Sequence, residues 1–253
     1  MSQNPVQKER LQKIIAKRGY CSRREADRLI AAGRVRAGGQ KADPGQLYEL
    51  DISIKIDGHS IAADKAPTVY WMLNKPDMTL VSRRGQGSKP SIYDLPSLAK
   101  IPFSVSYVGR LDYRTEGLLI MTNDGELAHR LCHPKYKVPR HYEVTLPRRL
   151  TRPELHNIRA GVELEDGPVR GCQIRFLGGV SMGRTTGAVY EVVVAEGRNR
   201  LVRRMFDALD LRVLNLVRKR FGELKLSAGL PSGKYRQLTP TEISFLKKTV
   251  SLK

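Results

Sequence analysis

The N-terminal part of the chain shows two short stretches of helical apolar spacing. From Lys8 the apolar residues recur at helical intervals among basic ones, and Gly19 then favours the end of a helix. Ser22 is a typical N-cap residue for a second helix over 23–32, which Gly33 ends. The pattern therefore predicts two basic helices joined by a tight turn.

Extended patterns follow these helices. Val35 begins a short predicted strand, and apolar residues alternate with polar ones across 47–57, which predicts another. Helices and strands together make a unit of the size of a small domain. We therefore predict a helix-turn-helix domain with short strands over 7–65, with a disordered tail at 1–6 and a linker at 62–67.

In the rest of the chain, strand patterns outnumber helix patterns. Strands are expected at 69–73, 141–146, 173–177, 188–195 and 213–220. Helices are expected at 124–131, 201–209 and 240–248. Because no strand–helix–strand repeat is evident, we predict an α+β fold for a second domain over 66–248, with a mixed, mostly antiparallel β-sheet and flanking helices. Residues 249–253 are predicted to form a tail.

The charge of the chain changes this picture most. The 253 residues carry a net charge of +20, and 40% of them are hydrophobic, which supports a packed core. So large an excess of positive charge repels itself unless a polyanion screens it, and nucleic acid is the commonest such partner. A membrane surface is the alternative, but no apolar run reaches the ~18 residues of a membrane span. The N-terminus also lacks the apolar segment of a secretory signal.

Cysteine and histidine spacing gives no sign of a metal centre. Three cysteines, Cys21, Cys132 and Cys172, form no CxxC pair, which is typical of reduced thiols in a cytoplasmic protein. His129 and His133 could share a helix face, but no third ligand lies nearby. We therefore expect no metal centre.

The run GRLDYRTEGLLIMTNDGEL over 109–127 places Asp112 beside apolar, strand-forming residues. An aspartate in this position is most often a structural cap or an ion-pair partner. In so basic a chain it also fits an acid held against a polyanion.

The N-terminal unit resembles the S4 RNA-binding domain over about 7–65. The segments RLQKII at 10–15, SRREA at 22–26 and LIAAGRV at 29–35 carry the resemblance. Gly38-Gly39 stands where the family usually has an Asn-Gly turn, and a double glycine can make the same hairpin. The resemblance implies binding to structured RNA. Arginines suit phosphate contacts, although a solvated face is the alternative for Arg23, Arg24, Arg28 and Arg34.

The run at 109–127 is similar to the catalytic motif of the pseudouridine synthases, in particular their RsuA/RluB branch. The resemblance implies that Asp112 is the catalytic aspartate and acts on a flipped-out uridine without a cofactor. Isomerisation breaks the N-glycosidic bond, turns the base and re-attaches it through carbon. The carboxylate could attack the base or C1′, stabilise positive charge at C1′, or assist proton removal.

Two further segments are similar to motifs of this family. HPKYKVPRHYEV at 133–144 implies that Tyr142 stacks on the target uracil, which replaces lost stacking energy of ~1–3 kcal/mol. EGRNRLVRRMF at 196–206 resembles the motif whose basic residue pairs with the aspartate. Arg198 takes that place most directly, with Arg200 as the second choice, and the pair would keep Asp112 ionised.

The C-terminal segments LNLVRKRFG at 214–222 and LPSGKYRQLT at 230–239 complete the resemblance. They imply that Leu216 or Val217 lines the uracil pocket. Arg110 would enter the space left by the extruded nucleotide, or else support the backbone.

Taken together, the motifs predict a monomeric ribosomal RNA pseudouridine synthase of the cytoplasm. Its substrate would be ribosomal RNA or an assembly intermediate, with 23S RNA of the large subunit favoured and 16S RNA the alternative. The alternative from another class is a non-catalytic RNA-binding or ribosome-assembly factor on the same scaffold.

Overall fold

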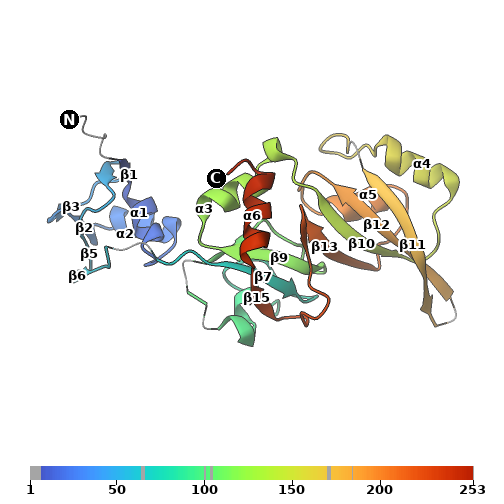
Figure 1. The fold of residues 1–253 in the computed structure, drawn as a ribbon, viewed down its shortest axis with the longest axis horizontal. Helices are drawn as coiled ribbons and strands as arrows, with labels where there is room; N and C mark the ends of the chain where they lie inside the picture. The colour runs from blue at the N-terminus through green and yellow to red at the C-terminus, as the bar shows by residue number, and fades with distance from the viewer. Residues whose placement is uncertain are drawn as a thin grey trace. The chain divides into compact units, whose positions relative to one another are not determined.

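The structure is a computed structural model that describes residues 7–63, 66–99, 101–102, 105–169, 172–183 and 185–252. The chain divides into two compact units (Figure 1). One comprises 1–69 with 101–106, and the other comprises 70–100 with 107–253. The predicted tail at 1–6 and two residues of the predicted linker lie outside the described residues.

The first unit packs two helices against short strands. Helix α1 spans Leu11–Lys17 and α2 spans Arg23–Ala31. The Ser22 hydroxyl accepts a hydrogen bond from the backbone N–H of Glu25 and so caps α2. The strands of this unit are β1 (Lys8–Arg10), β2 (Val35–Ala37), β3 (Gln40–Lys41), β4 (Leu47–Glu49), β5 (Ile54–Ile56) and β6 (His59–Ser60).

Two local predictions for this unit are corrected. Lys8–Arg10 is extended rather than helical, because it pairs antiparallel with β4. The stretch 47–57 forms two strands instead of one, since a turn closed by the Ile52 N–H and the Glu49 carbonyl interrupts it. Strands β3, β2, β5 and β6 then form a four-stranded sheet whose apolar side chains join the core of α1 and α2.

The second unit is built on a mixed sheet with the strand order β11-β12-β10-β13-β9-β7-β15. Strands β8 and β14 pair with β9 and β13 beside this path. Along this path, and for β14 with β13, the pairings are antiparallel except that of β9 with β13, so the predicted fold class is confirmed. The bounds are β7 (Tyr70–Lys75), β8 (Ser106–Val108), β9 (Glu116–Thr122), β10 (Arg140–Leu146), β11 (Gln173–Met182), β12 (Thr185–Val194), β13 (Asn215–Phe221), β14 (Leu224–Lys225) and β15 (Tyr235–Gln237).

Helices lie against this sheet. They are α3 (Gly125–Cys132), α4 (Arg152–Ala160), α5 (Leu201–Asp207) and α6 (Pro240–Thr249), with 3-10 turns η1 (Ile92–Asp94), η2 (Pro96–Leu98) and η3 (Pro134–Tyr136). Helices α3 and α6 lie side by side over β7 and β9, and α5 lies near β10 and β12 (Figure 1).

Two features of these helices differ from the predictions. Helix α4 was not predicted, although Thr151 and Glu154 form a reciprocal capping box at its start. The predicted tail at 249–253 is wrong for Val250, which is fully buried in the core shared by α3 and α6. Burial of this side chain fixes the end of α6 to the domain.

The parallel junction of β9 and β13 depends on a glycine. Gly117 has φ +99° and pairs with Arg218 across the junction. A Cβ atom at this position would overlap the backbone carbonyl and amide of Arg218. Only glycine allows this approach, and it brings the segment that precedes β9 against the middle of β13.

None of the helices in the described ranges has the length and apolar character needed to span a membrane.

Candidate active site

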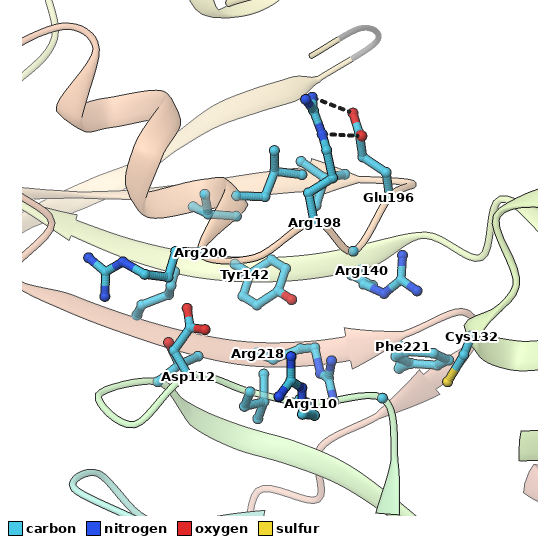
Figure 2. Close-up of a pocket in the computed structure, with 18 of the residues that line it drawn as sticks. Arg110, Asp112, Cys132, Arg140, Tyr142, Glu196, Arg198, Arg200, Arg218 and Phe221 are labelled. Atoms are coloured by element: carbon cyan, nitrogen blue, oxygen red, sulfur yellow. Dashed lines mark hydrogen bonds and ion pairs between the residues drawn. The ribbon is translucent and has the colours of Figure 1, made fainter. Parts of the chain in front are cut away.

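A pocket of about 380 Å³ lies where several distant segments of the second unit meet (Figure 2). This volume lies within the range that takes up a small molecule or a single base. The loop between β8 and β9 supplies Asp112, and the loop before α5 supplies Arg198 and Arg200. Strands β10 and β13 supply Tyr142 and Leu216.

Asp112 begins a tight turn whose carbonyl groups face buried cations. The N–H of Thr115 donates to the Asp112 carbonyl at 3.0 Å and closes the turn. The ammonium group of Lys75, which is fully buried, donates to the carbonyls of Tyr113 at 3.3 Å and Thr115 at 2.8 Å. Burial lowers the pKa of Lys75 to about 8, while the charges of Asp77, Glu116 and Asp112 act in the opposite direction.

Arg203 is the second cation at this turn. It projects from α5 and is 8% exposed, and its Nη2 donates to the Arg114 carbonyl at 2.5 Å. Its Nη1 donates to the carbonyl of Val213 at 3.1 Å. Burial lowers the pKa of Arg203, and the nearby Arg200 adds to this, whereas the charge of Asp112 raises it. Arg203 is therefore a buried cation that interacts electrostatically with Asp112.

The predicted pairing of Arg198 with Asp112 is wrong in this structure. The guanidinium of Arg198 is ion-paired with Glu196 at 2.8 Å and with Asp166 at 2.9 Å. It also donates to the carbonyls of Gly167 and Pro168, so its donors point away from Asp112 (Figure 2).

Arg200, the second choice, adopts a left-handed conformation with φ 48° at the start of α5 and lines the pocket. Arg203 lies one turn further into this helix, among the buried residues Leu201, Val202, Met205 and Phe206. A cation in so apolar a helix segment is the sequence signal that could have identified it.

Tyr142 lies where the sequence motif predicts an aromatic residue. It is 9% exposed, lines the pocket and lies opposite Arg218 in the pairing of β10 with β13. A register shift between His141 and Tyr142 interrupts this pairing. Bulges of this kind change the direction of a side chain.

The two candidates for the apolar wall separate in the structure. Leu216 is buried and lines the pocket, whereas Val217 is absent from the pocket wall and its side chain lies against Gly117. Successive side chains of a strand point to opposite faces, so only one of the two could occupy this wall. Arg110 is exposed at the rim of the pocket.

The pocket is strongly cationic. Five arginines line it beside two carboxylates, Asp112 and Glu196, and Glu196 is bound to Arg198. These arginines are Arg110, Arg140, Arg198, Arg200 and Arg218. Such a lining attracts a polyanion and leaves Asp112 as the carboxylate available for chemistry. The described residues contain no cluster of His, Cys, Asp and Glu that could hold a metal ion.

The four arginines predicted to bind RNA in the first unit are all exposed. Arg34 makes a bidentate contact with Asp57 at 2.7 and 2.5 Å, and Arg28 lies 3.4 Å from Glu25. Arg23 and Arg24 lie in the first turn of α2. Arg34 thus also has a structural role at the ends of β2 and β5.

An S4-like helical unit, a mixed sheet and a cationic pocket with one free carboxylate define a class of RNA-modifying enzymes. The family described as RNA pseudouridylate synthase matches residues 69–208, and the S4 domain family matches 9–50. The chain belongs to the RNA pseudouridylate synthase family and is an enzyme that isomerises uridine in RNA.

Similar proteins are found in several bacteria. "Ribosomal large subunit pseudouridine synthase B" of Pasteurella multocida (strain Pm70) is 38% identical over 98% of this chain and 72% of its own length. The protein of the same name from Escherichia coli (strain K12) is 38% identical over 96% of this chain and 84% of its own length. A solved structure described as "Crystal structure of pseudouridylate synthase" has a TM-score of 0.63 and 28% identity, covering 94% of this chain and 99% of that one.

Proposed function

We propose that this enzyme modifies ribosomal RNA of the large subunit and that Asp112 is its catalytic residue. The relatives at 38% identity carry the large subunit in their names and match nearly the whole chain, which favours 23S over 16S RNA. The observation that carries the catalytic role is the support of the turn that Asp112 begins. Two buried cations, Lys75 and Arg203, bind backbone carbonyls of this turn. An acid held so firmly at the rim of a pocket is pre-organised for reaction.

The pocket accounts for the other requirements of the reaction. A base inside a folded RNA must leave its stack before an enzyme reaches its glycosidic bond. Tyr142 offers an aromatic face for the extracted uracil, and Leu216 offers an apolar wall. Arg110, which is exposed at the rim, would enter the space that the nucleotide leaves.

Arg203 takes the role that the sequence motif suggested for Arg198. Its bond to the Arg114 carbonyl holds the turn of Asp112 in place, and the charge of Asp112 favours the charged form of Arg203. Arg203 is a positioning residue, because its donors contact the backbone of the turn.

The first unit would supply affinity for the RNA. We propose an S4 domain over 7–65, with Arg23, Arg24, Arg28 and Arg34 as phosphate contacts, and a catalytic domain over 66–248. Exposed guanidinium groups on a short helix suit the geometry of phosphates. A monomer acting in the cytoplasm on ribosomal RNA or on an assembly intermediate fits this arrangement.

Chemical mapping of pseudouridines in 16S and 23S RNA tests the function. RNA would be taken from cells that lack the protein and from the same cells complemented with wild type or D112N. We expect one or a few sites in 23S RNA that wild type restores and D112N does not. Sites in 16S RNA would redirect the proposal to the small subunit. A map that is the same in all strains would favour a non-catalytic assembly factor, and restored sites with D112N would refute the role of Asp112.

A further inference from the structure

A second buried arginine in the pocket does not contact the turn of Asp112. Arg218 lies in β13 and its side chain is 1% exposed. Its Nε donates to the carbonyl of Leu118 at 2.8 Å, and its guanidinium lies 5.1 Å from the centre of the Phe221 ring. These contacts hold the guanidinium in one orientation before any substrate binds.

The charge of Arg218 is not compensated by the residues around it. Among the described residues it takes part in no ion pair with a carboxylate, and its buried Nη2 atom has no hydrogen-bond partner. Burial lowers its pKa and the neighbouring Arg140 adds to this, yet a guanidinium remains charged in proteins. A buried, uncompensated cation is costly, and such costs concentrate at functional sites.

The position of Arg218 relates it to the base rather than to the backbone of the RNA. Leu216 and Arg218 are two residues apart in β13, so they project on the same face of the strand. Tyr142 lies opposite Arg218 on the neighbouring strand, and all three line the pocket (Figure 2). A uracil held between Tyr142 and Leu216 would therefore present an edge of its ring to Arg218.

We propose that Arg218 binds a carbonyl oxygen of the target uracil and stabilises the negative charge that the base gains as its glycosidic bond breaks. This role rests on the function proposed for the pocket. The electron pair of the C1′–N1 bond leaves with N1, and the charge spreads onto O2 and O4. The electron-poor C1′ is left beside the Asp112 carboxylate. Bond formation from C5 to C1′ returns an electron pair to the sugar.

The reaction then closes without a co-reactant. C5 loses its proton and N1 gains one, so substrate and product are isomers. A fixed cation beside O2 or O4 stabilises the negatively charged base formed during the reaction more than it stabilises the neutral base of the substrate or of the product. Differential stabilisation of this kind raises the rate of the chemical step with little effect on the affinity for the RNA.

The test compares two leaving groups under single-turnover conditions. The substrate is a ribosomal RNA fragment with the mapped target, carrying either uridine or 5-fluorouridine at that position. Fluorine makes the base more acidic and therefore a better leaving group. The measured quantity is consumption of the target nucleoside by wild type, R218M and R218K, followed by mass spectrometry after nuclease digestion.

We expect R218M to consume uridine ~100–1000-fold more slowly than wild type, with RNA affinity within a few-fold. On 5-fluorouridine the loss should be about ten-fold smaller, because a better leaving group needs less stabilisation. R218K keeps the charge but not the planar fork, so its rates should lie between those of wild type and R218M. Should R218M not fold, as judged by circular dichroism, R218K carries the same comparison.

Equal losses on the two substrates would overturn this role for Arg218, because a purely structural effect does not depend on the leaving group. Such a result would leave the proposed function intact. Failure of wild type to consume either nucleoside would instead refute the proposed function, and the role of Arg218 with it.

Discussion

The ammonium group of Lys75 lies 2.8 Å from the carbonyl oxygen of Thr115, at the end of the turn that Asp112 begins. The same ammonium binds the carbonyl of Pro76 at 2.8 Å, so three of its contacts are to backbone oxygens. A neutral amine has only two hydrogens to donate, whereas the ammonium has three. The protonated form of Lys75 is therefore the one that satisfies all three carbonyls.

The titration of Lys75 should be visible in the stability of the protein. Its pKa is lowered from 10.5 to about 8, chiefly by burial. Between these values the unfolded state binds more protons than the folded state, so stability rises with pH across that window. Relative to K75M, the free energy of unfolding of wild type should rise by on the order of 3 kcal/mol from pH 8 to 10.5.

Urea unfolding of wild type and K75M at several pH values measures this difference. K225M, which removes an exposed lysine of the same unit, is the control and should show no such trend. If the difference in unfolding free energy between wild type and K75M stays constant from pH 8 to 10.5, the lowered pKa of Lys75 is contradicted.

Arg203 and Arg204 are adjacent in α5, yet they should differ strongly in their effect on the reaction. Arg203 binds the turn of Asp112, whereas Arg204 is ion-paired with Asp166. We expect R203M to lower the single-turnover rate by ~100-fold or more with little change in RNA affinity. R204M should lower it less than about ten-fold.

R198M extends this comparison to the residue that the sequence motif favoured. Because Arg198 is bound to Glu196 and Asp166, its loss should cost less in rate than the loss of Arg203. A larger effect of R198M than of R203M on the rate of the chemical step would mean that the loop rearranges on binding RNA and that the motif-based assignment holds.

Arg198 and Arg203 show how far the sequence could specify the site. The motif located the right segment, because residue types in order along the chain are visible in a sequence. It could not specify which side chain of α5 points inward, since that depends on how the helix packs against the rest of the domain. The orientation of Arg198 depends on Asp166, far away in the sequence.

The same distinction holds for the fold. A strand with strong apolar alternation, such as β10, was predicted to within one residue of its observed bounds, whereas the prediction for β12 began three residues too late. The short strands β14 and β15 were missed, because two or three residues carry no periodicity of their own. Their pairing with β13 and β7 decides their conformation.

Tyr142 should contribute through its ring and its hydroxyl separately. Y142F keeps the aromatic face but removes the hydroxyl. Y142L removes the face as well, and the loss of base stacking costs ~1–3 kcal/mol. We therefore expect a modest fall in rate for Y142F and a fall larger by ~10-fold or more for Y142L, measured at saturating RNA. Equal rates for the two variants would show that the ring does not stack on the uracil.

The exposed arginines of α2 should act through the phosphates of the RNA. R23A/R24A is expected to weaken binding and to lower the slope of log affinity against log salt by about one for each phosphate that is no longer bound. R34A should change the slope less, because Arg34 is bound to Asp57. Filter binding or fluorescence anisotropy from low to high salt measures both. A slope unchanged in R23A/R24A would remove α2 from the RNA-binding surface.

Gly117 and Gly167 provide a matched pair for the junction of β9 and β13. Their φ angles are +99° and +101°, so alanine pays a similar backbone cost at both. Only Gly117 faces an obstacle, the backbone of Arg218, whereas no atom lies within 4 Å of a Cβ at Gly167. G117A should therefore lose about 1–3 kcal/mol more of unfolding free energy than G167A.

G117A should also lose activity beyond its loss of stability, because the junction places Asp112 against β13. Urea unfolding and single-turnover rates below the unfolding transition measure the two effects. Equal stability of the two variants would show that β9 and β13 can separate at no cost, and the close approach would then have no part in building the site.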